Sequence, residues 1–386
     1  MLIVRNIPSG SKIAVAMSGG VDSGVAAALL VEDGYEVRGL FMKHLEGVVG
    51  QEEARQVADC LGIPLDVVDL REEFRRGVID YFLAEYCAGR TPNPCVVCNK
   101  VIKFGQLLDY ASNLGCDHLA TGHYSRLRRE PPNRTRLLRA VDEGKDQSYF
   151  LWQLAQGQLA RVAFPVGDLT KERVREVAEE RGLPVARRPE SFEICFVSDS
   201  LEEFLRRHLP KEIEPGSVLN VKGEVIGRHQ GLPLYTYGQR RGFELDGYQG
   251  IPLYVVGIDK ENNTLIVGRG AESEVKGFVV RDLNWISPRS QLSTIRLGSP
   301  SARRVNYQLS CSIRIRHQGK LLPATVGVLQ GGRARVVLDE PTRAVTPGQS
   351  AVFYEGDEVL GGGVITALAL DSAYPACYAD PRMDGG

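Results

Sequence analysis

The first third of the chain alternates short apolar runs with helical patterns, and this alternation restricts its fold more than any other feature. The apolar runs, which resemble buried strands, are residues 12–17, 36–42, 65–70 and 118–120. The segments with helical spacing are residues 24–31, 52–61, 72–87 and 104–114. Strands that alternate with helices form a parallel sheet with helices on both faces. The sequence therefore predicts an α/β domain with ligands at the carboxyl ends of its strands, near Ser18, Met42 and Gly122.

The chain changes character beyond about residue 205. Residues 254–267 form two β-rich arms around Asn262–Asn263, the pattern of a hairpin. Short strands between Gly/Pro turns, at residues 310–316, 324–328, 333–338 and 351–354, predict a small β-barrel. We expect an α/β domain over residues 1–204, with an inserted helical segment near 164–187 in which Thr170 caps a helix at Lys171–Arg181. A mostly β connector over 205–272, a barrel over 273–371 and a loose tail over 372–386 follow.

Composition narrows the class of protein. The chain has 386 residues with 47 Lys+Arg against 48 Asp+Glu, so its net charge of −1 excludes bulk electrostatic attraction to nucleic acid. Eight cysteines are too few for a secreted disulfide scaffold and are expected to be thiols. No apolar run approaches the roughly 18 residues of a membrane span. We therefore expect a cytoplasmic protein without membrane partners.

A glycine-rich segment, Ser18–Gly24 (SGGVDSG), lies between the first predicted strand and helix. Its glycines allow an anion to approach the backbone, and the helix that follows offers free N–H groups. The segment lacks the Gly-Lys-Ser/Thr ending of a Walker A loop. An ordinary strand–helix turn is the structural alternative.

The cysteine spacing is more informative than the cysteine count. Cys95 and Cys98 form a C-x-x-C in a segment with two prolines, which predicts a rigid exposed turn rather than a regular element. Lys100 and Lys103 lie nearby and predict a lowered thiol pKa. A redox pair is one alternative. With the distant Cys195, the pair offers three soft ligands, too few for a closed zinc site but suited to an iron–sulfur cluster. The other five cysteines are interpreted as core residues.

Arginines gather in one short segment despite the neutral total. Residues 124–139 contain one acid and six arginines, which are Arg126, Arg128, Arg129, Arg134, Arg136 and Arg139. A solvated hairpin face is the plain interpretation. Because the segment directly follows His123, we interpret it as a phosphate-backbone contact for RNA.

Motifs along almost the whole chain resemble those of the bacterial tRNA-specific 2-thiouridylases. They are AMSGGVDS, GRTPNPCVVCNKVIKFG, ATGHYSR, KDQSYFLW, FPVGDLTKERVREVAEE, ESFEICF, HQGLPLYTYGQRRG, VTPGQSAVFY and LGGGVI. The resemblance implies a Rossmann-like PP-loop (ATP-pyrophosphatase) domain, a small central domain and a C-terminal β-barrel. It also implies an enzyme that uses ATP and Mg²⁺ to adenylate C2 of the wobble uridine of tRNA, releases AMP and diphosphate, and replaces the oxygen with sulfur.

The resemblance carries over to individual residues. It implies a nucleophile at Cys98 and a persulfide-bearing cysteine at Cys195, which end as a disulfide. The ATP contacts that it implies are Ala16, Met17, Ser18, Gly19, Gly20, Val21, Asp22, Ser23, Met42 and Gly122. The tRNA contacts that it implies are Asn93, Pro94, Cys95, His123, Lys145, Asp146, Gln147, Arg316, His317 and Gln349. The expected partners are tRNAs for Lys, Glu and Gln, and a sulfur donor such as a cysteine desulfurase or a relay protein.

One departure from the family pattern concerns Cys95, where many members have an acidic residue. A thiol suits metal ligation better than general-base catalysis. We therefore hypothesise that Cys95, Cys98 and Cys195 hold a [4Fe–4S] cluster, with the persulfide–disulfide route as the equal alternative.

Two other functions compete with tRNA thiolation. A PP-loop ligase acting on a small molecule accounts for SGGVDS but leaves the three cysteines and the barrel unused. An iron–sulfur protein that binds or senses RNA accounts for the cysteines and arginines but not for a pyrophosphate loop. Pyrophosphate release separates the three, since it should respond to tRNA, to a small acceptor or to neither.

Overall fold

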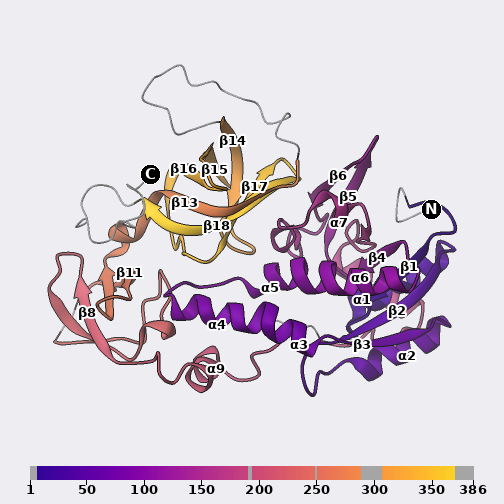
Figure 1. Cartoon of the computed structure of the whole chain (residues 1–386), viewed down its shortest axis with the longest axis horizontal. Coiled ribbons are helices and arrows are strands. Elements are labelled where there is room, and N and C mark those ends of the chain that lie inside the picture. Colours follow the sequence, from indigo (N-terminus) through magenta and orange to yellow (C-terminus); the bar gives the residue numbers. More distant parts are fainter. Residues whose placement is uncertain (1–6, 190–193, 248–249, 288–306, 370–386) are drawn as a thin grey trace.

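The computed structural model describes residues 7–189, 194–247, 250–287 and 307–369. The N-terminal part contains a five-stranded parallel sheet (Figure 1). Its strands, in spatial order, are β3 (Leu65–Asp69), β2 (Glu36–Lys43), β1 (Lys12–Ala16), β4 (His118–Thr121) and β7 (Val162–Ala163). The predicted tail at 372–386 lies outside the described residues.

Helices cover both faces of this sheet. Adjacent residues of β1 point to opposite faces, and because these residues are apolar, each face must be covered. Ile13 and Val15 pack with α1 (Val21–Glu32), α2 (Gln51–Leu61) and α8 (Lys171–Glu180), whereas Ala14 belongs to the core on the other face. That second core contains two long helical segments. The first segment consists of α3 (Arg71–Phe74), the π-helical residues Arg75–Ile79 and α4 (Asp80–Cys87). The second segment consists of α5 (Pro94–Val97), the π-helical residues Cys98–Leu107 and α6 (Leu108–Asn113).

The two long segments lie side by side and extend away from the sheet toward the central part of the chain (Figure 1). The central part follows α9 (Leu201–His208) and forms a second sheet. Its strands, in spatial order, are β10 (Glu244–Leu245), β9 (Val225–His229), β8 (Gly216–Asn220), β12 (Thr264–Gly268) and β11 (Tyr254–Asp259). Strands β11 and β12 pair antiparallel, which confirms the predicted hairpin.

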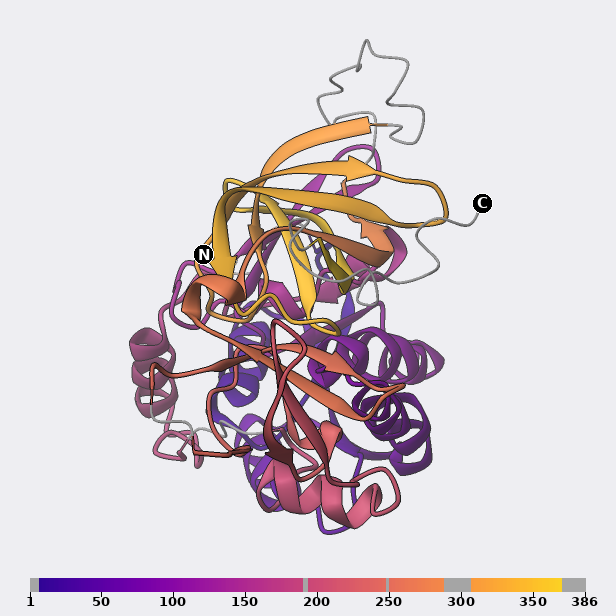
Figure 2. The same cartoon turned by 90° about the vertical axis from the view of Figure 1, so that its left-hand side faces the viewer.

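The C-terminal part is a closed six-stranded barrel (Figure 2). Its strands, in spatial order, are β13 (Glu274–Trp285), β16 (Ala334–Arg343), β15 (Leu322–Val328), β14 (Tyr307–Arg314), β17 (Ser350–Glu355) and β18 (Glu358–Ala369), and β18 pairs again with β13. Closure removes the exposed sheet edges. The predicted fold class is therefore confirmed. Within the described residues, no helix combines the length and the apolar character that crossing a bilayer requires.

A hairpin from the N-terminal part joins the barrel to the α/β sheet. Strands β5 (Ser125–Glu130) and β6 (Arg134–Arg139) follow β4 directly, and Leu138 of β6 pairs with Glu358 of β18. The remaining short helices of this region are Ser148–Phe150 and α7 (Gln156–Leu159). The hairpin thus places the barrel next to the carboxyl end of β4.

Candidate active site

The glycine-rich loop after β1 forms a closed turn around the start of α1. Gly19 has φ +75°, which an L side chain rarely adopts. The Ser18 backbone N–H donates to Ser23 Oγ at 3.3 Å, and that hydroxyl donates to the Gly20 carbonyl at 3.0 Å. The α1 N-cap is Gly20, so no side chain caps the first N–H groups of this 12-residue helix. Free N–H groups and the positive end of the helix dipole suit a bound phosphate.

Two glycines let the neighbouring segments approach this loop closely. A Cβ on Gly19 would lie 2.2 Å from the Gly50 carbonyl oxygen, and a Cβ on Gly122 would lie 2.7 Å from the Ser23 backbone nitrogen. Met42 is the penultimate residue of β2, which lies beside β1, and Gly122 follows β4 on the other side. The structure therefore brings together the segments expected to bind ATP, Ala16–Ser23, Met42 and Gly122, at the carboxyl edge of three adjacent strands.

Asp22 on the first turn of α1 has two partners that sequence reasoning missed. Lys171 Nζ lies 2.6 Å from Asp22 Oδ1, and the Tyr124 hydroxyl donates to the same oxygen at 2.7 Å. Lys171 begins α8, whose predicted Thr170 cap is confirmed by the Arg173 N–H donating to Thr170 Oγ1. The helix was predictable, but its contact with the loop spans 149 positions of sequence and carried no local signal.

The C-x-x-C motif is helical, so the prediction of an exposed turn was wrong. Pro94 occupies the first position of α5, where its missing N–H costs nothing, and Cys95 follows it. Cys98 begins the π-helical segment and is 8% exposed, whereas Cys95 remains accessible. A π-helix has i→i+5 hydrogen bonds, so Lys103 lies about one turn after Cys98.

The prediction of lowered thiol pKa values was also wrong. Desolvation of the sulfur raises the pKa of Cys98 to about 11 and that of Cys195 to about 12, and it raises the pKa of Cys95 as well, although Cys95 and Cys195 as whole residues are exposed. Lys103 lowers all three, but by less than burial raises them. The charges of Cys98 and Cys95 raise the pKa of Cys195. Cys195 therefore lies near the C-x-x-C motif in the fold, although it is distant in sequence. The three groups are therefore neutral thiols near pH 7 in this state.

The described residues include no group of three or more His, Cys, Asp or Glu side chains arranged to hold a metal ion. Cys95, Cys98 and Cys195 are free, neutral and close enough to interact. The three cysteines thus form no site for a single metal ion, and the hypothesised [4Fe–4S] cluster stays a prediction. Among the cysteines interpreted as core residues, Cys116 is buried, Cys60 is exposed, and Cys377 lies beyond the described chain.

Residues from the barrel contact segments next to the cysteine helix, which comprises α5 and the π-helical residues Cys98–Leu107. Gln349 Nε2 donates to the Thr91 and Pro92 carbonyls at 3.0 and 3.1 Å, just before Asn93. The ring of His317 lies 4.4 Å from that of Phe150, whose carbonyl accepts from the Asn99 side chain. Arg316, before His317, is exposed. Several residues expected to contact tRNA thus lie around the cysteines, where the two domains meet.

His123 connects the phosphate loop to the cysteine helix. It follows Gly122, is 8% exposed, and its ring centroid lies 5.7 Å from that of Phe104. The Thr121 hydroxyl lies 2.6 Å from its Nδ1. Burial holds the pKa of His123 well below its usual value, and Lys103 lowers it further, so this imidazole is neutral.

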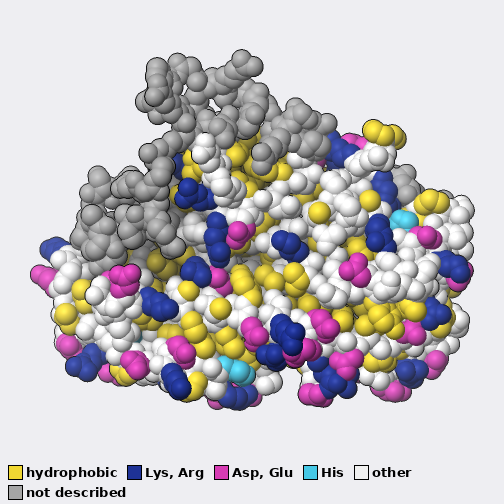
Figure 3. Space-filling view, viewed as in Figure 1, with side chains coloured by type: hydrophobic (Ala, Val, Ile, Leu, Met, Phe, Trp, Pro, Cys, Tyr) yellow, Lys and Arg dark blue, Asp and Glu magenta, His cyan; other side chains and the backbone are white. Residues whose placement is uncertain are grey.

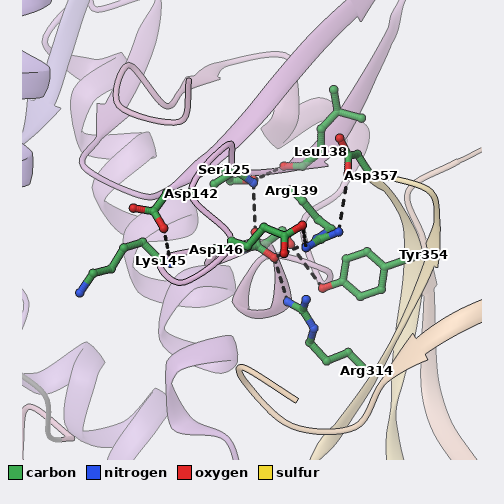
Figure 4. A network of polar contacts seen from close by, with 12 residues as sticks. Ser125, Leu138, Arg139, Asp142, Lys145, Asp146, Arg314, Tyr354 and Asp357 are labelled. Atoms are coloured by element: carbon green, nitrogen blue, oxygen red, sulfur yellow. Dashed lines mark hydrogen bonds and ion pairs between the residues drawn. The ribbon is translucent and has the colours of Figure 1, made fainter. Parts of the chain in front are cut away.

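Asp146 has a structural role rather than the expected contact with tRNA. It is 1% exposed, and its carboxylate binds Arg314 at 2.8 Å and Arg139 at 3.6 Å (Figure 4). The Ala140 and Ser148 N–H groups donate to its other oxygen at 3.2 and 3.1 Å. A carboxylate enclosed in this way has no surface for a macromolecule. Its sequence neighbours Lys145 and Gln147 are half-buried. Their expected contact with tRNA stays a prediction.

The arginine-rich hairpin is mostly engaged in protein contacts, which corrects its interpretation as an RNA surface. Arg134 and Arg136 both bind Glu358, which is 3% exposed. Three further arginines of the hairpin donate to protein carbonyls or carboxylates, namely Arg126, Arg129 and Arg139. Arg128 is exposed and makes no such contact within the described residues. The cluster therefore attaches the hairpin to the barrel.

The face of the molecule in Figure 3 has Lys and Arg side chains interspersed with Asp and Glu. No large area of one sign is visible on this face, as expected from the balanced composition. A nucleic acid on this face would meet scattered cations rather than a continuous basic surface.

Comparisons with known proteins give matches over almost the whole chain. Models described as tRNA methyl transferase HUP domain, tRNA methyl transferase PRC-barrel domain and Aminomethyltransferase beta-barrel domain match residues 11–199, 202–269 and 275–365. The tRNA-specific 2-thiouridylase MnmA of Chloroflexus aggregans is 47% identical over 369 residues, which cover 92% of this chain and 98% of that protein. Its namesake from Escherichia coli O1:K1 / APEC is 44% identical over 374 residues, with coverage of 92% and 97%.

A solved 4-thiouridine synthetase–RNA complex with bound ATP has a TM-score of 0.33 and 18% identity, over 52% of this chain and 50% of that one. That likeness is too low to support a functional comparison. The sequence matches are much stronger. The family models cover all three parts of the fold, and the relatives are close to half identical over nearly the whole chain. The chain therefore belongs to the family of tRNA-specific 2-thiouridylases.

Proposed function

We propose that this protein is an ATP-dependent sulfurtransferase that converts the wobble uridine of tRNA to 2-thiouridine. The observation that carries the proposal is the direct connection between the phosphate loop and the cysteine helix. Gly122 lies against the loop, and the next residue, His123, lies against Phe104 of the cysteine helix. A base bound between them would meet activated phosphate on one side and sulfur on the other.

The first step forms an adenylated base. The uridine O2 attacks the α-phosphorus of ATP, the O–P bond forms, and pyrophosphate leaves with the electron pair of the broken bond. The N–H groups at the start of α1 stabilise the charge on that leaving group. Mg²⁺, bound with ATP as part of the substrate, supplies further neutralisation, and Asp22 is the carboxylate of the loop that can take it.

The second step transfers sulfur. The terminal sulfur of a persulfide on Cys195 attacks C2 of the base, and AMP leaves with the former O2. The Cys98 thiolate then attacks the sulfur of Cys195, the S–S bond breaks, and the transferred sulfur stays on the base. The two cysteines end as a disulfide, which a dithiol reductant must reopen. Cys98 is near enough to raise the pKa of Cys195 electrostatically, which supports a reaction between the two.

The steps above use the persulfide–disulfide route, and none of them passes through an iron–sulfur cluster. Anaerobic purification followed by iron and acid-labile sulfide analysis tests this choice. We expect thiolation by an iron-free anaerobic preparation. Stoichiometric iron and sulfide, with activity lost when they are removed, would restore the cluster as sulfur carrier.

The partners follow from the same assignment. We propose tRNA as substrate, with Lys, Glu and Gln isoacceptors as the expected set, and a desulfurase or relay protein as sulfur donor in the cytoplasm. Asn93, Pro94, Cys95, His123, Lys145, Gln147, Arg316, His317 and Gln349 are the proposed contacts. Phosphate contacts make binding salt-dependent, so tRNA affinity should fall steeply as salt rises. A flat salt response would contradict this assignment.

Pyrophosphate release with different acceptors tests the function. We expect unmodified tRNA to stimulate release from ATP and, with a sulfur donor, to gain 2-thiouridine detectable by mass spectrometry of nucleosides. Stimulation by a small acceptor, but not by tRNA, would instead indicate a small-molecule ligase. tRNA binding without any pyrophosphate release would indicate a non-enzymatic RNA-binding protein.

A further inference from the structure

We propose that Lys171 is a ligand of the pyrophosphate part of ATP, and that Asp22 holds its ammonium group at the phosphate loop until Mg²⁺–ATP binds. This inference rests on the proposed function, because it requires that the loop binds a polyphosphate. It assigns a role to a residue far from the loop in sequence and outside the expected ATP contacts.

The position of Lys171 is the first observation. Its side chain is 8% exposed, and Nζ lies 2.6 Å from Asp22 Oδ1 and 5.7 Å from the centroid of the Tyr124 ring. The Tyr124 hydroxyl donates to the same Asp22 oxygen at 2.7 Å. The ammonium group is therefore held beside the first turn of α1, where the loop presents its N–H groups.

The location is costly for a lysine, which indicates a specific requirement. Lys171 occupies the first turn of α8, and the positive end of a helix dipole disfavours a cation there. Burial of an ammonium group is costly as well unless it is paired. Its backbone N–H is fixed by Asp142 Oδ2 at 2.9 Å, so both the backbone and the side chain of this residue are positioned.

The loop itself has no cation to meet the charge of a leaving pyrophosphate. Ser18–Ser23 contains neither lysine nor arginine, in contrast to a Walker A loop. Arg188 also reaches the loop, but its guanidinium donates to the Gly19 carbonyl at 2.7 Å and lies 3.1 Å from Glu53, so it supports the backbone. Among the described residues, Lys171 is the cation that an ion pair with Asp22 holds beside the helix N–H groups.

The ion pair can exchange partners when substrate binds. The Asp22 carboxylate is a hard oxygen ligand that suits Mg²⁺, and phosphate oxygens suit a lysine ammonium. On binding of Mg²⁺–ATP, Asp22 turns to the metal and Lys171 to the phosphates. No covalent bond is made or broken in this exchange. The cation then stabilises the charge that develops as pyrophosphate leaves.

Binding of sodium pyrophosphate in the absence of Mg²⁺ tests the proposal, because substitutions of Lys171 and Asp22 should change the affinity in opposite directions. Lys171→Met removes the ligand, so we expect affinity to fall about tenfold or more. Asp22→Asn removes a competing negative charge and releases the lysine, so we expect affinity to rise severalfold. An ion pair that only stabilises the fold predicts a loss, or no change, for both substitutions, and either result would overturn the proposal.

Three further measurements keep the test interpretable. Lys171→Arg should recover part of the affinity, and Lys12→Met, which breaks the exposed Lys12–Glu36 pair, should leave it unchanged. Thermal unfolding identifies variants that fail to fold. If Lys171→Met unfolds, Lys171→Arg and Asp22→Asn still give the opposite signs that the proposal requires. With Mg²⁺–ATP, Lys171→Met should lower kcat for pyrophosphate release more than it raises KM.

Failure of this inference and failure of the proposed function give different results. A wild-type protein that binds no pyrophosphate and releases none from ATP with tRNA contradicts both. A wild-type protein that does both, with Lys171→Met equal to wild type in pyrophosphate affinity, contradicts only the role of Lys171.

Discussion

The phosphate loop and the cysteine helix lie next to each other, but they are prepared for chemistry to different degrees. The loop is complete: its turn is closed by Ser18 and Ser23, its helix N–H groups are free, and Asp22 has its partners. The thiols are not, because the pKa values of Cys98 and Cys195 are raised and the two are not linked as a disulfide. The proposed nucleotide site is thus formed in this fold, whereas the proposed sulfur chemistry first requires ionised thiols.

This difference suggests an order of events. A protonated thiol is a poor nucleophile, so raised pKa values slow reactions of Cys98 and Cys195 near pH 7. A persulfide has a lower pKa than a thiol, and a bound base displaces water and changes the surroundings of Cys98. We therefore infer that adenylation precedes attack by sulfur, and the two regions should be separable by substitution.

The largest effect should come from the cysteines. Cys98→Ser or Cys195→Ser should reduce formation of 2-thiouridine by about 10³-fold or more, because neither hydroxyl can form the disulfide. tRNA-stimulated pyrophosphate release in a single turnover should stay within a few-fold of wild type. Cys60→Ser, on the exposed side of α2, is the matched control and should change neither. Equal loss of both activities would show that the regions are not separable.

The second prediction concerns Gly19. Gly19 and Gly10 have nearly the same φ, +75° and +78°, but a Cβ on Gly10 meets nothing within 4 Å. Gly10→Ala should therefore cost only the strain of about 1 kcal/mol in the free energy of unfolding. Gly19→Ala should cost more and should weaken ATP binding about 100-fold, because the Gly50 carbonyl must move. Urea unfolding measures the free energy of unfolding, and nucleotide titration measures ATP affinity. If both variants lost the same unfolding free energy, the close approach of the Gly50 carbonyl to Gly19 would not matter.

Asp146 should affect stability rather than chemistry. Asp146→Asn leaves Arg314 and Arg139 without their buried carboxylate, so we expect the free energy of unfolding to fall by about 3 kcal/mol. Glu143→Gln breaks only the exposed pair with Arg139 and should cost under about 0.5 kcal/mol. A folded Asp146→Asn protein with normal stability and weakened tRNA binding would instead support a direct contact.

The smallest effect should come from Lys103. Because the pKa of Cys98 is raised to about 11, its alkylation by iodoacetamide should accelerate about tenfold per pH unit from pH 7 to 10. Lys103→Met should slow alkylation a few-fold at fixed pH, since it removes the cation that lowers the thiol pKa. Lys100→Met, an exposed neighbour, should have no effect. Mass spectrometry follows each cysteine; pH-independent alkylation would contradict the raised pKa.

Local patterns predicted most of the fold. The apolar runs, the Thr170 cap and the hairpin of β11 and β12 were correct because each depends on a few consecutive residues. The C-x-x-C turn was wrong because proline favours the first position of a helix as well as a turn, and only packing decides between the two. The arginine hairpin was misread for a related reason: Glu358, its main partner, lies more than 200 positions away.

The sequence by itself determined the class of fold, the phosphate loop and the candidate cysteines, because spacing, glycine conformation and thiol chemistry are properties of short segments. Tertiary structure alone decided the ionisation of those thiols, the burial of Asp146 and the contact between Lys171 and Asp22. The physical reason is that desolvation and ion pairing depend on which distant side chains surround a group, and sequence separation carries no record of that proximity.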